Sequence, residues 1–286
     1  MGYVDYREDT EASVDTWEVL DQQRAESPGN FVVPPGVSEI SWVKLYAAQD
    51  KGADGIVRLA TAFKLDGMGI NSAFKPFYLP GPFGGTSNTG ASEQSLHLHE
   101  DIVFNTAIPV VPGQTIVASG QMFGEDAVDV QFGIVLGYNC PRNPGSGPII
   151  RATAMREADL ADATEALVAL TGDLEGGTSN AIIPTGVGRI AGIAYGAGVD
   201  VALDTRIAHH FELDGDGLPL AIKPQRWCGV FGTNRLDTEG GETWYKKPEL
   251  LWVDWPVVQG RAVTMRAGMV EDDYGAGTAF QCLLMV

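Results

Sequence analysis

Apolar residues recur at every second position along several segments of the chain, and this period predicts β-strands. From Val57 to Leu65 every second residue is apolar or threonine, while the residues between them are mixed in character. The same alternation occurs in 128–136 and 263–269. Because successive side chains of a strand point to opposite faces, each segment is expected to bury one face. Turns rich in glycine and proline, such as Pro112-Gly113, separate these segments, so the pattern predicts an all-β protein.

The first half of the chain contains about eight expected strands. They lie near residues 14–20, 31–33, 39–47, 56–65, 74–79, 95–107, 114–123 and 128–138. Eight strands at irregular spacing with long connections favour a jelly roll over a regular meander or a propeller blade.

The second half of the chain repeats the first. Residues 63–84 and 211–232 are identical at 11 of 22 positions without a gap, at an offset of 148 residues (211 − 63). Segment 31–40 resembles 181–190 at an offset of 150, and 109–117 resembles 256–264 at an offset of 147. Self-similarity at a nearly fixed spacing indicates a duplicated domain, and small changes of offset are what loop insertions produce. The sequence therefore predicts two tandem jelly-roll β-sandwich domains related by internal duplication.

This comparison sets the expected domain boundaries. Residues 1–13 are polar and acidic, and we expect an N-terminal arm that becomes ordered on assembly. The first jelly roll is expected at 14–138 and the second at 164–286. Residues 139–163 are the expected linker, which begins with a segment rich in proline and glycine. Within it, the structure of 151–162 stays open, since these alanine-rich residues have the propensity of a short helix.

Composition narrows the classes of partner. The net charge is −18, from 37 acidic and 19 basic residues, so we expect no direct binding to nucleic acid. No apolar run approaches the roughly 20 residues that span a bilayer, so we expect no membrane insertion. The acidic start of the chain has no basic flank and no apolar stretch, and we expect no signal peptide. The three widely spaced cysteines contain no CxxC motif and are expected to be reduced thiols.

His97 and His99 form a candidate metal pair, because both side chains lie on the same face of an extended strand. The sequence His97-Leu98-His99-Glu100 resembles the first motif of the cupins, whose HxH is followed a few residues later by a glutamate. Here Glu100 follows directly, and no later histidine accompanies Pro112-Gly113. We therefore expect a solvated or interface histidine pair, with no bound metal or other cofactor.

Asp214-Gly215-Asp216-Gly217 resembles part of a calcium loop, since its acidic residues alternate. The first copy has Asp66-Gly67-Met68-Gly69 at the equivalent position. A turn with glycine at a positive φ explains both copies, whereas calcium explains only one. We predict the turn.

A set of loop residues is shared by both copies. It consists of LDGxG, then Lys-Pro, then Gly-x-Phe-Gly, and its candidate interface or fold-determining residues are Lys75, Pro76, Phe83, Lys223, Pro224 and Phe231. None of these short sequences is a catalytic motif. The chain also lacks GxSxG, HExxH, a phosphate loop and a GxGxxG that opens a helix, so we predict no catalytic residues and no enzyme.

Two tandem jelly rolls without an evident active site resemble the double jelly-roll major capsid proteins of icosahedral viruses. This resemblance implies a homotrimer in which six barrels form a pseudo-hexagonal capsomer, in contact with further capsid subunits of a virion. The predicted function is that of a virion structural protein, either the capsid shell itself or a trimeric cement protein that stabilises it.

Two alternatives remain open. One is a bicupin-type metal-dependent enzyme with metal at His97 and His99. The other is a carbohydrate-binding or adhesion module, in which exposed tryptophans stack on sugars. The candidate tryptophans all lie in the second copy: Trp227, Trp244, Trp252 and Trp255.

Overall fold

The structure is a computed structural model that describes most of the chain. The described residues are 2–11, 16–22, 29–49, 57–86, 96–97, 102–123, 130–150, 153–160, 167–172, 179–199, 205–234, 243–246, 249–269 and 278–285. Within these residues the chain forms β-strands and two short 3-10 turns, Ser72–Phe74 and Pro144–Ser146. None of the described helical segments is long and apolar enough to cross a membrane.

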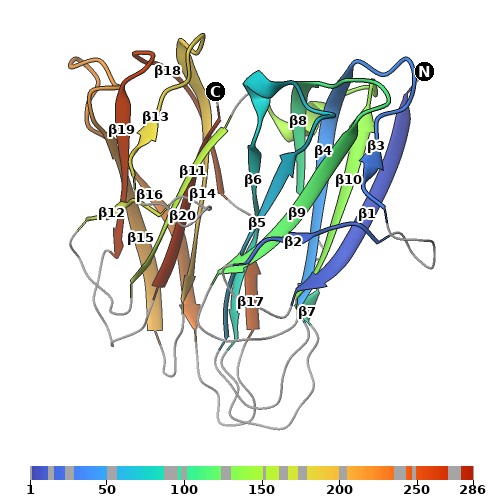
Figure 1. Ribbon diagram of the computed structural model, residues 1–286. Coiled ribbons are helices and arrows are strands. Elements are labelled where there is room, and N and C mark those ends of the chain that lie inside the picture. The colour runs from blue at the N-terminus through green and yellow to red at the C-terminus, as the bar shows by residue number, and fades with distance from the viewer. Residues whose placement is uncertain are drawn as a thin grey trace, which may run out of the picture.

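The first barrel consists of two facing antiparallel sheets (Figure 1). The β4 sheet contains β1 (Tyr3–Glu11), β10 (Val130–Tyr138), β4 (Glu39–Gln49), β8 (Ile102–Pro109) and β7 (Leu96–His97). The β5 sheet contains β6 (Phe77–Thr86), β5 (Val57–Asp66), β9 (Thr115–Phe123), β2 (Glu18–Val19) and β3 (Phe31–Val32). Most neighbouring strands in each sheet are distant in sequence, such as β1 and β10 or β4 and β8, whereas β5 and β6 follow one another. This order is that of a jelly roll.

The second barrel repeats this order. Its β14 sheet contains β11 (Thr153–Leu160), β20 (Thr278–Met285), β14 (Arg189–Val199) and β18 (Glu249–Pro256). Its β15 sheet contains β12 (Val168–Leu170), β13 (Ala181–Ile182), β19 (Ala262–Met269), β15 (Thr205–Asp214) and β16 (Gln225–Asn234). The remaining strand, β17 (Thr243–Lys246), pairs with β6 of the first barrel. The expected all-β class and the two tandem jelly rolls are confirmed.

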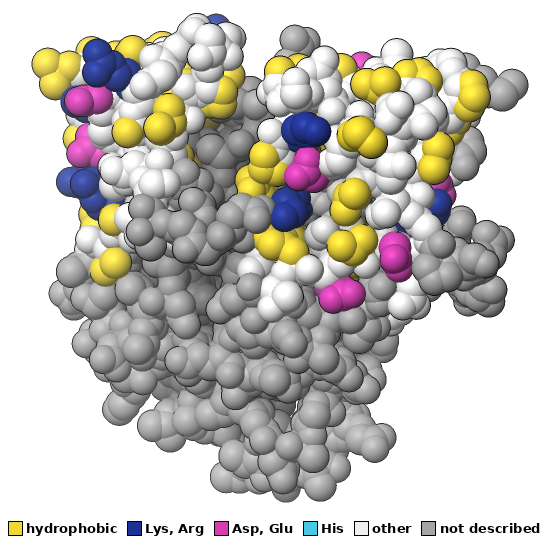
Figure 2. Space-filling view, viewed as in Figure 1, with side chains coloured by type: hydrophobic (Ala, Val, Ile, Leu, Met, Phe, Trp, Pro, Cys, Tyr) yellow, Lys and Arg dark blue, Asp and Glu magenta, His cyan; other side chains and the backbone are white. Residues whose placement is uncertain are grey.

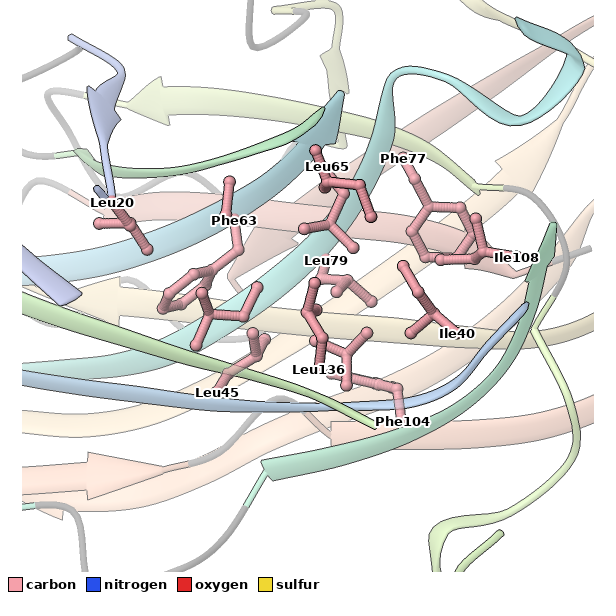
Figure 3. Packing of buried hydrophobic residues seen from close by; sticks show 14 of the residues in the cluster. Leu20, Ile40, Leu45, Phe63, Leu65, Phe77, Leu79, Phe104, Ile108 and Leu136 are labelled. Atoms are coloured by element: carbon pink, nitrogen blue, oxygen red, sulfur yellow. The ribbon is translucent and has the colours of Figure 1, made fainter. Parts of the chain in front are cut away.

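Apolar side chains from both sheets of the first barrel meet in its core (Figure 3). Phe63 on β5 has no exposed surface and contacts Phe132 on β10 edge to face, with ring centroids 5.5 Å apart. Other buried members are Leu20, Ile40, Leu45, Leu65, Phe77, Leu79, Phe104, Ile108 and Leu136. This core is what the period-two alternation of the sequence predicts.

The second barrel has an equivalent core. Phe211, which aligns with Phe63, stacks on Trp227 with ring centroids 5.8 Å apart and planes 8° from parallel. Tyr195 on the facing sheet lies 4.8 Å from Phe211 between centroids. Trp227 aligns with Leu79 at an offset of 148, and Tyr195 aligns with Leu45 at an offset of 150. Leu79 and Leu45 belong to the first core, so the duplication extends from sequence to packing.

The expected N-terminal arm is instead a strand of the first barrel. β1 pairs with β10 along its whole length, from Tyr3 opposite Tyr138 to Glu11 opposite Val130. Two charged residues of β1 form a buried ion pair, in which Arg7 Nη1 lies 2.7 Å from Asp5 Oδ1. Arg7 also lies over the buried Phe31 ring, 4.8 Å from its centroid. Asp5 and Arg7 thus occupy the buried face of the strand, where the alternating pattern would place apolar residues, and their charges are paired.

The linker between the barrels is also shorter than the predicted range of 139–163. The alanine-rich segment, which has helical propensity, contains the strand β11, paired with β20 from Thr153 opposite Met285 to Leu160 opposite Thr278. Tertiary pairing overrides helix propensity here. The second barrel therefore begins ahead of the expected boundary at residue 164.

The remaining linker is held against the first barrel. The buried Asn105 side chain donates to the carbonyl oxygens of Asn143 and Gly147 at 2.7 and 3.0 Å, and it accepts from the Asn143 backbone N–H at 3.0 Å. Arg142 Nη2 lies 2.6 Å from Glu39 Oε1. These contacts fix the path of the chain as it leaves the first barrel.

Candidate interface

The two shared loops have the same internal hydrogen bonds. Lys75 Nζ donates to the carbonyl oxygen of Gly67 at 3.1 Å, and Lys223 Nζ donates to that of Gly215 at 3.4 Å. The Lys75-Pro76 and Lys223-Pro224 peptide bonds are both cis. Each lysine thus ties its Lys-Pro segment to the preceding glycine turn of the same barrel.

The glycine turn itself is confirmed in both copies. Gly67 has φ +95° and Gly215 has φ +108°, in the region where glycine is favoured. The Gly69 and Gly217 backbone N–H groups each donate at 2.7 Å to a carbonyl of the neighbouring strand, those of Thr115 and Ala262. Asp216, which is Met68 in the first copy, is not needed for this geometry. Its carboxylate Oδ1 lies 3.3 Å from Lys223 Nζ.

Replacing Gly67 by alanine is expected to destabilise the first barrel by more than about 2 kcal/mol. The new Cβ would lie 2.6 Å from the Thr115 carbonyl oxygen, which belongs to the backbone and cannot move aside cheaply. Gly36→Ala is the matched control, because Gly36 also has a positive φ of +79° but has nothing within 4 Å of the new Cβ. Urea unfolding followed by circular dichroism should show a larger loss for Gly67→Ala than for Gly36→Ala. Equal losses would contradict the steric explanation.

The remaining candidate residues fall into two groups. Phe83 and Phe231 are backbone-paired members of β6 and β16, opposite Ala60 and Ala208 respectively. His97 lies in β7 opposite Ala48, while His99 is outside the described residues. In the part of the chain that the structure describes, no group of three or more His, Cys, Asp or Glu residues is placed to hold a metal ion.

Two of the candidate sugar-stacking tryptophans belong to the second core. Trp227 and Trp255 are partly buried and pack against that core, with ring centroids 6.2 Å apart. Trp252 is half-exposed and its ring lies across Gly147 of the linker. Of Trp244, only the backbone position in β17 is described. Core packing therefore accounts for Trp227 and Trp255.

The two barrels contact each other through unlike sheets. Strands β14 and β20 of the second barrel lie against β5 and β6 of the first (Figure 1). Ala62 on β5 points away from the first core, since its neighbour Phe63 points into it, yet Ala62 has no exposed surface. Pro80, which is paired with Ala62, is buried as well. Ala194 of β14 is buried in the same apolar cluster as Ala62. The outer face of the β5 sheet is therefore covered by the outer face of the β14 sheet.

On the equivalent face of the second barrel, the two matching positions are more exposed than in the first. His210 and Cys228 align with Ala62 and Pro80 at an offset of 148 and are paired with each other in the same way. His210 is only half-buried and Cys228 is exposed. The same sheet position is thus buried in one copy and open in the other.

A charged cluster occupies this open face, which is the outer face of the β15 sheet. The buried Glu212 carboxylate lies 2.7 Å from Arg226 Nε and 2.6 Å from Arg266 Nη1, and Arg266 also lies 3.5 Å from Asp214. The Arg226 side chain is 69% exposed. Figure 2 shows basic and acidic side chains next to one another on the left side of the second barrel. Glu212 aligns with Lys64 and Arg226 with Tyr78, so the cluster is particular to the second copy.

An aromatic patch covers the outer face of the first barrel's β4 sheet. Trp42 lies across Gly137, and Tyr6 and Tyr46 flank Gly133, so all three rings are on the side away from the core. Tyr46 is 40% exposed, and the neighbouring Val4 is 52% exposed. We call Val4, Tyr6, Trp42 and Tyr46 the aromatic face.

The second copy has small residues where the first has this aromatic face. Trp42, Lys44 and Tyr46 align at an offset of 150 with Gly192, Ala194 and Gly196. These small residues lie on the strand that packs closely against the first barrel. The aromatic face is therefore exposed in the first barrel, whereas the equivalent surface of the second barrel already contacts the first barrel.

Comparisons with known proteins leave the family open. No protein-family model matches the chain, and no curated protein matches it. Among solved structures, the chain is similar to the crystal structure of the STIV MCP, a viral major capsid protein, at a TM-score of 0.38 and 8% identity over 100% of this chain and 96% of that chain. It is also similar to the N-terminal CBM22-1-CBM22-2 tandem domain of Paenibacillus barcinonensis Xyn10C, at a TM-score of 0.20 and 8% identity over 98% and 94%. The first belongs to the class of protein that the sequence resembles. At these TM-scores and identities, neither likeness adds to the case for a function.

Proposed function

We propose that this chain is a virion structural protein, acting as a capsid shell subunit or a capsid-stabilising cement protein, that works by self-assembly and without catalysis. The observation that carries the proposal is the contact between its own barrels. The outer face of the β5 sheet meets the outer face of the β14 sheet, and the equivalent β15 and β4 faces are open at the two ends of the molecule.

Such a contact joins unlike surfaces and can therefore be repeated. A contact of one face with a different face of the next unit is heterologous, and it produces a ring when the rotation between units closes. Here the next contact would place the aromatic face of one chain on the charged β15 face of another. Aromatic residues and arginine are the types that are enriched at interfaces, and both are exposed on these faces.

Three chains arranged in this way would form a ring of six barrels in which contacts within a chain alternate with contacts between chains. The linker contacts made by Asn105 and Arg142 support this arrangement, because they fix one barrel relative to the chain that leads to the next. A virion location and contacts with further capsid subunits follow from this role.

Native mass spectrometry and electron microscopy of the purified protein test the proposal. We expect a stable trimer of the 30.5 kDa chain that forms closed particles, or that coats particles formed by another shell protein. A monomer at tens of micromolar concentration would overturn the proposal. A monomer with stoichiometric metal that is lost in His97→Ala would overturn it in favour of the bicupin alternative.

A further inference from the structure

The second barrel already contributes a strand to the first. β17 belongs to the second half of the chain, yet it pairs antiparallel with β6 at the edge of the β5 sheet. Its four residues, Thr243 to Lys246, lie opposite Thr86, Gly85, Gly84 and Phe83 in that order. β18, which begins at Glu249, returns to its own barrel and pairs with β14. One short stretch of chain therefore joins sheets of two barrels through backbone hydrogen bonds.

The equivalent strand of the first barrel has a smaller role in the single chain. β7 aligns with the start of β17 at an offset of 147, so that Leu96 corresponds to Thr243 and His97 to Trp244. Among the residues that the structure describes, β7 pairs with Gln49 and Ala48 at the end of β4. Two described residue pairs thus join β7 to β4, whereas four join β17 to β6.

The strand equivalent to β6 has an open edge. β16 aligns with β6 at an offset of 148, and both pair on one side with the strand that precedes them, β15 and β5. On its other side β6 carries β17, whereas β16 has no second partner among the residues that the structure describes. A free strand edge presents a row of unpaired N–H and C=O groups, which is a template for another strand.

We propose that β7 of one chain adds to the β16 edge of the next chain in the assembly. The occupant is a second copy of this chain, because the chain itself shows the same addition between its two barrels and the accompanying sheet faces are open in both partners. This inference rests on the proposed function, since it requires the second barrel of one chain to lie beside the first barrel of another. On assembly β7 leaves the end of β4 and pairs with the β16 edge of the next chain instead.

The existing β17–β6 ladder fixes the register of the new one. Transferring its pairs by the two offsets places Leu96 opposite Asn234 and His97 opposite Thr233 of the next chain. His97 would then lie in the ladder between β7 of one chain and β16 of the next, as Trp244 lies in the ladder between β17 and β6 of a single chain. His97, one of the two candidate metal ligands, is therefore part of the strand that joins subunits.

Disulfide trapping across the new ladder tests the proposal. The variants are Leu96→Cys with Asn234→Cys, and His97→Cys with Thr233→Cys, both in a Cys228→Ser background that removes the exposed native thiol. Neighbouring pairs of an antiparallel ladder have Cα separations of about 5.5 and about 4.5 Å, and both values lie within the range that a disulfide spans. The off-register control is Leu96→Cys with Thr233→Cys.

After mild oxidation of the assembled protein, we expect covalent dimers and trimers on a denaturing gel for an in-register pair, and at least tenfold less for the off-register control. Trimers without a cross-link from either in-register pair would overturn the strand addition and leave the proposed function intact. A failure of the Cys228→Ser protein to form trimers, with the unmodified chain also monomeric, would overturn both. Cross-links within one chain would overturn the strand addition, because they place β7 on the β16 edge of its own chain.

A second variant locks β7 in its starting position. Ala48→Cys with His97→Cys joins the paired residues of β4 and β7 within one chain. We expect the oxidised protein to remain monomeric and to assemble when the disulfide is reduced. Equal assembly in the oxidised and reduced states would contradict the departure of β7 from β4.

Discussion

Replacing Phe63 by alanine is expected to lower the free energy of unfolding of the first barrel by about 3–5 kcal/mol. Phe63 is fully buried between the two sheets and contacts Phe132 edge to face. β5, which carries Phe63, is held on both sides by its ladders to β6 and β9, so the space left by the ring closes only partly. The loss comprises the transfer free energy of the ring and the cost of the cavity.

Calorimetric or urea unfolding measures this effect, and the duplication supplies a matched variant. Phe211→Ala removes the aligned ring of the second barrel, where we expect a loss near the lower end of the same range, because the half-buried Trp227 stacked on Phe211 is free to move into the space. Met68→Ala is the surface control, since Met68 is 71% exposed and a change within about 0.5 kcal/mol is expected there. A loss below about 1 kcal/mol for Phe63→Ala would mean that this position is not at the centre of a packed core.

The sequence predicted the fold wherever alternation and repetition agreed. Strands β4, β5, β9 and β10 each lie within a few residues of their expected positions, because one face of each is continuously apolar and buried. The Asp-Gly turns were predicted for the same reason, since both copies keep the glycine that a positive φ requires.

The two strands that the sequence missed, β1 and β11, lie at the edges of equivalent sheets. In β1, the buried pair of Asp5 and Arg7 replaces apolar residues. In β11, alanines and charged residues suggest a helix, and only the ladder to β20 makes the segment a strand. Aligned at an offset of 150, the two strands share only Asp9 and Asp159, so the repeat itself carried no signal there.

The candidate interface was harder to predict than the fold, because it lies where the copies differ. Residues shared by both copies, such as Lys75 and Lys223, make hydrogen bonds within their own barrels. The two barrels of one chain share a fold, but their equivalent outer faces make different contacts. These faces therefore carry different residues. Trp42 against Gly192 is one such difference. The signal available in the sequence was the set of positions at which the two copies differ in outward-facing residues.

Replacing both Trp42 and Tyr46 by alanine is expected to weaken trimer formation at least a hundredfold. Both rings lie on the open aromatic face, and buried aromatic anchors at the centre of an interface each contribute about 2 kcal/mol or more. Tyr46 is 40% exposed in the single chain, with the Lys44 ammonium 5.1 Å from its ring centroid. Its removal therefore costs the isolated barrel little. Sedimentation equilibrium of the variant and the unmodified chain measures the association constants, and circular dichroism verifies that the variant is folded.

Leu220→Ala is the control for a general loss of exposed apolar surface. Leu220 is 84% exposed and lies in the turn between β15 and β16, outside the strands that form the aromatic face and the β15 face. If scattered apolar contacts caused self-association, this variant would weaken it as much as the double variant does. If the aromatic face is the subunit contact, Leu220→Ala leaves the association constant unchanged, and Tyr46→Ala alone lowers it about thirtyfold. A folded double variant that still forms trimers would contradict the heterologous contact, because the aromatic face lies on β4, the strand equivalent to β14, by which the second barrel already contacts the first.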